Sequence, residues 1–257
     1  MQTRKVLKVY SRTPYFSQFE AYKTEDEGSW FQLVTRSGLA SLRTVGATYR
    51  DDDALLSAFV ERWHPETNSF HFLWGELTIT LHDVQRIMGL PIHGRSLSSA
   101  TWTDSMVRER LTADLGVTLK TIQTWVNDGG IPCNVVSAEL LKWLKEDDRD
   151  EFKCASYYMF LLLSSTVFVD KSTNRGKHHW FALLFDHGVT AEYAWGAGVL
   201  AMLYRQLGTA SRRAAQGLAG CPILLRVRHS YCSCYYCCIS YCCCSCCYSL
   251  LLTLICY

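Results

Sequence analysis

Charged residues stop at Arg228, although the chain continues to Tyr257. All 26 basic and 24 acidic residues lie at or before that position, mixed with the apolar residues that a core requires. A hydrophobic share of 49% excludes a fully disordered chain. The length suits one large domain or two small ones, at roughly 100–200 residues per domain. The net charge of +2 excludes a strongly basic nucleic-acid-binding protein.

The uncharged segment 231–257 is a different kind of sequence, which holds ten of the 13 cysteines. Its length would span a bilayer and its cysteines could be lipidated, but only residues 250–255 have the composition of an ordinary span. We interpret residues 226–257 as an aberrant Cys/Tyr-rich tail, translated through an intron or in a shifted frame, after a domain truncated at its C-terminal end. A membrane anchor is the alternative. Zinc binding is not favoured, because Cys234-x-x-Cys237 has no partner cluster elsewhere.

The N-terminal segment shows no clear periodicity, and we expect residues 1–36 to form a poorly ordered leader. It lacks the apolar run of a secretory signal. The body of the chain contains only Cys133, Cys154 and Cys221, which do not make a disulfide framework. A reducing compartment therefore fits best.

Apolar residues recur at helical spacing through most of the body. Leu56, Phe59 and Val60 share one face of a helix over residues 54–63 with Trp63, which is therefore expected in the core. Further helices are expected over residues 104–115, 118–126, 137–144, 151–169, 190–207 and 211–225. The uncharged part of the 151–169 helix is shorter than the roughly 20 residues of a membrane span, which predicts a buried core helix.

Two β-prone runs, residues 69–73 and 77–80, flank a glycine-containing turn and predict a β-hairpin. Thr80 and Asp83 have the spacing of a capping box at the start of the next helix. Gly89 can close that helix, and Pro91 prevents its continuation. The sequence therefore predicts a mainly α fold, a single helical domain with one small β-hairpin near residues 69–80.

The surroundings of this hairpin form the candidate binding site. The candidate binding residues are Arg62, His71, Trp74 and Glu76. Trp74 lies in the turn, where an indole is open to a ligand. His71 and Glu76, with His82 and Asp83, could do acid–base chemistry, but Asp83 already has a capping role and a glutamate in a turn is usually solvated. We therefore assign no catalytic residue.

A second cluster resembles a metal site in composition only. It consists of His178, His179, Asp186 and His187. Adjacent histidines on a regular element point in different directions, and no second ligand pair has an i, i+4 spacing. We therefore assign no metal ligand. Gly-x-Gly-x-x-Gly, Walker A and Gly-x-Ser-x-Gly patterns are absent from the sequence, so no cofactor is predicted.

Two blocks of sequence carry a family likeness. The first comprises residues 53–63, 65–67, 70–71, 75–76, 78–84 and 89–94, and the second comprises residues 168–175, 193–205 and 210–216. In this order they resemble the plant mobile domain, over about residues 37–225. His64 stands where the family has arginine, and His93 stands where it often has aspartate. These two changes leave the fold intact but weaken any essential role for charge there.

The resemblance implies a non-enzymatic protein of the nucleus that binds nuclear or chromatin proteins. It implies roles in meristem maintenance, transposon silencing and genome stability. The label "aminotransferase-like" is attached to the family, but these residues do not support transaminase chemistry. Direct DNA binding is expected to be weak and sensitive to salt, given the net charge. Two alternatives remain open: a metal-dependent enzyme acting on nucleic acid or phosphate substrates, and a protein tethered to a membrane if residues 231–257 are genuine.

Overall fold

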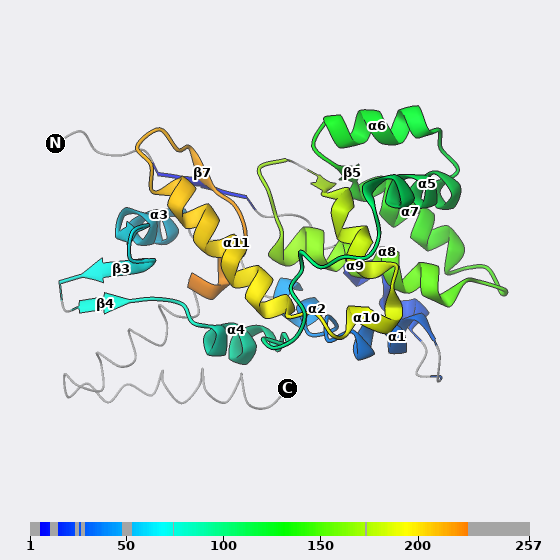
Figure 1. Ribbon diagram of the computed structural model, residues 1–257, viewed down its shortest axis with the longest axis horizontal. Coiled ribbons are helices and arrows are strands. Elements are labelled where there is room, and N and C mark those ends of the chain that lie inside the picture. Colours follow the sequence, from blue (N-terminus) through cyan, green and yellow to red (C-terminus); the bar gives the residue numbers. More distant parts are fainter. Residues whose placement is uncertain are drawn as a thin grey trace.

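The helix α8 (Glu151–Leu162), which is buried from its second turn onward, forms the centre of the fold. The structure is a computed structural model that describes residues 6–10, 15–23, 26, 29–47, 53–73, 75–172 and 174–225. Every side chain from residue 154 to residue 162 is buried, and the helix packs against elements on several sides (Figure 1). These elements are η1 (Tyr15–Tyr22), α1 (Trp30–Arg36), α7 (Cys133–Trp143), η2 (Leu163–Val167) and α9 (Phe181–Leu184). The apolar run thus forms the predicted core helix.

The remaining helices surround this centre. They are α2 (Leu42–Ala47), α3 (Asp53–Glu61), α4 (Leu81–Met88), α5 (Asp104–Leu115), α6 (Leu119–Asn127), η3 (His178–Trp180), α10 (His187–Thr190) and α11 (Trp195–Ala210). In Figure 1, α11 runs between α3 with the β-hairpin on one side and the helices α5–α9 on the other. The predicted mainly α fold is confirmed. None of the helices in the described part of the chain combines the length and apolar composition that crossing a bilayer requires.

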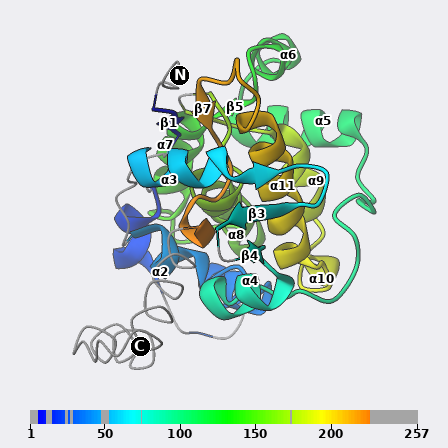
Figure 2. The same ribbon diagram turned by 90° about the vertical axis from the view of Figure 1, so that its left-hand side faces the viewer.

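A hairpin is present in the predicted region as β3 (Ser69–Phe72) and β4 (Gly75–Leu77), which pair antiparallel. Its second strand was wrongly placed at residues 77–80, because β4 begins inside the predicted turn and ends at Leu77. A third strand, β2 (Trp63–His64), pairs with β3 on its other side. We expected Trp63 at the end of a helix, but α3 ends two residues earlier and the chain is already extended at Trp63. Trp63 is buried, as predicted, and lies 5.2 Å from Tyr204 of α11 between ring centroids. Figure 2 shows α3 and β3 in front of α11.

Two short strand pairs join segments that are distant in sequence. β1 (Lys8–Val9) pairs parallel with β7 (Gly217–Leu218), and β5 (Ile131–Pro132) pairs antiparallel with β6 (Arg175–Gly176). The final helix that we predicted over residues 211–225 is a wrong prediction, because residues 211–222 form turns, bends and the strand β7, and only residues 223–225 are helical. Gly220 has a φ of +96°, and Gly217 is extended in β7. Both glycines therefore lie in non-helical backbone beyond the end of α11, in keeping with their low helix propensity.

The N-terminal segment is built into the core. Leu7, Phe19 and Trp30 are each at most 2% exposed. The backbone N–H of Leu7 donates to Ser57 Oγ at 2.8 Å, and the backbone N–H of Trp30 donates to Glu151 Oε2 at 2.6 Å. The prediction of a poorly ordered leader over residues 1–36 is therefore wrong for the residues of that segment that the structure describes. The predicted tail, residues 226–257, lies outside the described residues.

Helix α4 follows the sequence signals closely. The backbone N–H of Asp83 donates to Thr80 Oγ1 at 3.2 Å, and the backbone N–H of Thr80 donates to Asp83 Oδ2 at 2.8 Å, which completes the predicted capping box. Gly89 adopts the left-handed conformation that ends the helix, with a φ of +67°, and Pro91 follows. Helix α7 is less well predicted. It begins at Cys133, so Ser137, which we expected as its N-cap, lies buried inside it.

Replacing Thr80 with alanine should lower the free energy of unfolding by about 1 kcal/mol, because one backbone N–H at the start of α4 loses its acceptor. Urea denaturation of the two proteins measures the difference. Thr80→Ser is the control, because it keeps the hydroxyl and should stay close to the parent. A Thr80→Ser protein as unstable as Thr80→Ala would show that the methyl group, and not the cap, matters here.

Raising the pH through 10 should destabilise the fold through its buried tyrosines. Burial raises the pKa of Tyr158 to about 12, so the folded protein keeps a proton that the unfolded chain releases near pH 10. The free energy of unfolding is therefore unaffected by this group below pH 10. It falls by about 1.4 kcal/mol per pH unit as the pH rises from 10 towards 12. Among the described residues, the Tyr158 hydroxyl has no hydrogen-bond partner, so Tyr158→Phe removes the titration while keeping the packing. Urea denaturation at a series of pH values should show a shallower alkaline decline for this variant. Equal slopes in both proteins would refute the assignment.

Candidate functional site

The hairpin brings together some of the predicted binding residues. His71 and Glu76 are cross-strand partners on β3 and β4, and His71 Nε2 lies 3.5 Å from Glu76 Oε2. The hydroxyl of Ser69 donates to the same Glu76 oxygen at 2.9 Å. The His64 ring of β2 stacks on the His71 ring with centroids 3.8 Å apart. These polar groups on the small sheet therefore contact one another.

Of the other predicted residues, Arg62 contacts the pair through its backbone, because its carbonyl oxygen accepts from the backbone N–H of His71 at 2.9 Å. Arg62 places its guanidinium 5.8 Å from the centroid of the Phe72 ring. Asp83 holds the N-terminus of α4, as expected, and His82 is exposed. Trp74 lies outside the described residues. The binding role of the four hairpin residues stays a prediction.

In the described part of the chain, His178 and His179 of the second cluster make separate contacts. His178 Nε2 hydrogen-bonds to Asp104 Oδ1 at the start of α5, and Arg108 pairs with the same carboxylate. Burial alone would raise the pKa of Asp104, but His178 and Arg108 together hold it below its ordinary value. The His179 ring lies 6.0 Å from that of His178 and is turned by 71°. Within the described ranges, no group of three or more His, Cys, Asp or Glu could hold a metal ion.

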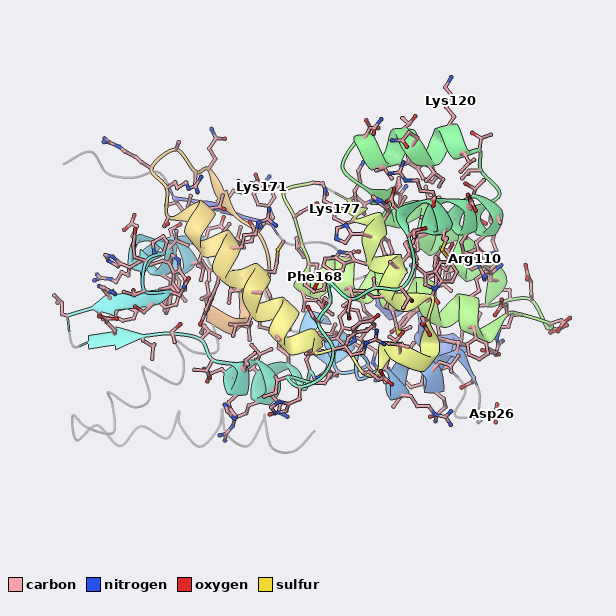
Figure 3. The ribbon with its side chains drawn as sticks, viewed as in Figure 1. Asp26, Arg110, Lys120, Phe168, Lys171 and Lys177 are labelled. Carbon is pink, nitrogen blue, oxygen red and sulfur yellow. The ribbon has the colours of Figure 1, made fainter. Side chains whose placement is uncertain are left out.

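A cleft of about 590 Å³ opens where α5, α8 and α10 meet. Its volume falls within the range of roughly 300–1,000 Å³ of ligand pockets. We call it the aromatic cleft and define it by the residues Trp102, Arg110, Asp150, Phe152, Lys153, Ser156, Phe185, Asp186 and Gly188. In Figure 3, Arg110 lies on the side of α5 that faces this region, whereas Lys120 on α6 points away from the domain.

Arg110 has a buried anchor beside the cleft. Its Nε donates to Asp114 Oδ2 at 2.7 Å, and the Tyr157 hydroxyl donates to the same oxygen at 3.1 Å. Burial, followed by the charge of Asp114, raises the pKa of Tyr157 well above its ordinary value, so the phenol stays protonated and remains a donor. The guanidinium lies 5.7 Å from the centroid of the Phe185 ring. The position of Arg110 is thus fixed by a carboxylate, a phenol and an aromatic face.

Most of the residues that line this cleft were not predicted from the sequence. Trp102 precedes α5, Phe152 and Lys153 lie in the first turn of α8, and Phe185 follows α9. These segments are far apart in the chain and carry no common motif. Only the i, i+4 spacing of Arg110 and Asp114 was a local signal, since it predicts a pair on one helix face. Asp186, a member of the histidine-containing group to which we assigned no metal ligand, lies here, in the wall of the cleft.

Comparisons with known proteins connect this geometry to a family. A profile of the plant mobile domain matches residues 38–230. The chain is 33% identical over 234 residues to "Protein MAINTENANCE OF MERISTEMS" of Arabidopsis thaliana, covering 88% of the chain and 45% of that protein. It is 34% identical over 229 residues to "Protein MAIN-LIKE 2" of the same plant, covering 83% of the chain and 32% of that protein.

One further relative bears the name of an enzyme. The chain is 33% identical over 189 residues to "Serine/threonine-protein phosphatase 7 long form homolog" of Arabidopsis thaliana, covering 68% of the chain and 13% of that protein. The chain thus spans less than half the length of each of these relatives. No solved structure matches it. The family profile and the identities above 30% agree with the two sequence blocks, and the chain belongs to the plant mobile domain family.

Proposed function

We propose that this chain is a non-enzymatic binding module that acts in the nucleus through protein or chromatin partners. Its proposed roles are meristem maintenance, transposon silencing and genome stability. Support for the meristem role comes from the names of the relatives and from identities of 33% and 34% over most of the chain. The silencing, genome-stability and nuclear parts rest on the family resemblance.

The aromatic cleft is the observation that carries a binding role. Its wall includes Phe152, which is 56% exposed, and the half-buried rings of Trp102 and Phe185. Aromatic side chains and arginine are enriched at surfaces that bind other proteins. Such a wall offers apolar area to a ligand, and the charged residues around it can fix the orientation of that ligand.

An enzyme is the competing proposal, and one relative is named a phosphatase. The hairpin residues that would serve it are His71 and Glu76, which contact each other at 3.5 Å, and Asp83, which caps α4. We favour a non-enzymatic role because these contacts serve the structure of the hairpin and of α4. Metal-dependent hydrolysis of a phosphate ester that Glu76→Ala abolishes would contradict this part of the proposal.

Imaging in plant cells tests the location and the tail together. The full chain with an N-terminal fluorescent tag is compared with a version that ends at Ser230. We expect both in the nucleus, with proximity labelling enriched in chromatin proteins over a nuclear-targeted tag alone. A full chain on membranes, beside a shortened chain that is not, would refute the nuclear proposal and favour the tethered alternative.

Direct DNA binding is a subsidiary part of the same proposal. With a net charge of +2, we expect low affinity that falls as salt increases, because phosphate contacts release counterions. Titrations of labelled duplex DNA at two salt concentrations measure this. An affinity that does not change with salt would refute an electrostatic contact.

A further inference from the structure

We propose that the aromatic cleft binds a basic peptide segment of a partner protein, with a lysine or arginine side chain held against the aromatic wall by Asp150 and Asp186. This inference rests on the proposed binding role and specifies the chemistry of the partner. Three features of the cleft support it: its rings, the cations already on ring faces, and its carboxylates.

The rings offer faces to a cation. Trp102 and Phe185 meet with centroids 5.2 Å apart and planes inclined at 54°, so the two rings form an angled wall. Phe152 lines the same cleft from α8. Aromatic faces attract ammonium and guanidinium groups within about 6 Å of the ring centroid, and most strongly where the aromatic is tryptophan.

Each of the two cations that line the cleft lies on a ring face, Arg110 on a ring of the cleft and Lys153 on a ring outside it. The Arg110 guanidinium lies 5.7 Å from the Phe185 centroid, and Lys153 Nζ lies 4.0 Å from the centroid of the Trp143 ring. Arg110 is neutralised by Asp114 at 2.7 Å. Lys153 is directed onto Trp143, which is not among the residues that line the cleft. The electrostatic repulsion between these two cations and a basic ligand is therefore reduced.

Two carboxylates line the cleft beside its two cations. Asp150 and Asp186 balance the charges of Arg110 and Lys153, and Asp114, which pairs with Arg110 from outside the lining, adds a third carboxylate. The Thr101 hydroxyl donates to Asp186 Oδ2 over a long distance of 3.5 Å. Asp186 Oδ1 lies near Gly188, since a Cβ added to this glycine would be 3.7 Å from that oxygen. Asp150 caps α8 through Oδ1, while its Oδ2 lies 3.9 Å from Arg110. Asp186 is thus the carboxylate best placed for a ligand cation, whose charge it complements.

Fluorescence anisotropy with defined peptides tests the inference on the full chain. The probe is a labelled peptide of alternating lysine and glycine, compared with a peptide of equal length that has glutamate in place of lysine. We expect the lysine peptide to bind more tightly. Asp186→Asn and Phe152→Ala should each weaken its binding by roughly 3- to 10-fold, the loss expected for one exposed cation contact.

Two matched variants control for general effects. Glu192→Gln removes a carboxylate that pairs with Arg95 outside the cleft, and Leu119→Ala removes an exposed apolar side chain from α6. Both should bind the lysine peptide like the parent, with unchanged circular dichroism. Tighter binding of the glutamate peptide would overturn the inference and assign the cleft to acidic ligands through Arg110 and Lys153. Equal losses in the control and cleft variants, or no binding of the lysine peptide, would also overturn it. Any of these results, with nuclear accumulation intact, would leave the proposed function standing.

Discussion

Alanine in place of Trp30 should lower the free energy of unfolding by about 3–5 kcal/mol, the range for removal of a fully buried large aromatic side chain. Trp30 is completely buried, and its ring meets Tyr158 of α8 edge-on at 4.9 Å between centroids. The indole Nε1 donates to the carbonyl oxygen of Tyr22 at 3.0 Å, so the side chain also connects η1 to α1. Alanine would leave a cavity against α8 and an acceptor without its donor. Urea denaturation followed by circular dichroism measures the loss.

Leu119→Ala is the control for this prediction, because Leu119 is 55% exposed and its removal should change stability by less than about 0.5 kcal/mol. A Trp30→Ala protein as stable as this control would show that the N-terminal segment does not belong to the core.

The folded domain begins before the residues that the family profile matches. The family profile begins at residue 38, whereas the folded unit includes Trp30 and Leu7 upstream of it. A protein shortened to the matched residues should therefore be much less stable than the full chain.

Local signals were sufficient for several elements. Val107, Leu111 and Leu115 share one face of α5 and are all buried, and both bounds of that helix agree with the prediction. The capping box of α4 was predicted for the same reason, since its two partners are three residues apart. In each case the information lies within one or two turns of helix, where spacing alone determines which side chains meet.

Elements stabilised by distant partners were not predictable in this way. Trp30 is held by Glu151 and Leu7 by Ser57, and neither segment has a periodicity that would reveal these partners. The same applies to β7, which is a strand because β1 lies beside it. The aromatic cleft is the extreme case, because residues of three segments meet there only after the helices have packed. Tertiary contacts therefore decide both the N-terminal fold and the candidate site.

Gly130→Ala should be the most damaging small substitution in the loop that connects α6 to β5. Gly130 has a φ of +137°, and a Cβ added there would lie 2.2 Å from the carbonyl oxygen of Gly176 in β6. We expect a loss of roughly 2–6 kcal/mol in the free energy of unfolding, because backbone strain of this kind costs about 1–3 kcal/mol and overpacking adds about 1–3 kcal/mol. The clash is with backbone, so no side chain can turn away to relieve it. Thermal and urea denaturation measure the loss.

The neighbouring Gly129 provides a matched control, since the two glycines differ in one respect that matters here. Gly129 also has a positive φ, of +108°, but a Cβ there would meet nothing within 4 Å. Gly129→Ala should therefore lose only the strain contribution, about 1–3 kcal/mol. The difference between the two variants isolates the close approach of the 128–130 loop to β6, where Arg175 Nη1 also donates to the Gly130 carbonyl oxygen at 3.0 Å. Equal losses would mean that backbone conformation alone requires glycine at both positions, and that the contact between this loop and β6 has room for a methyl group.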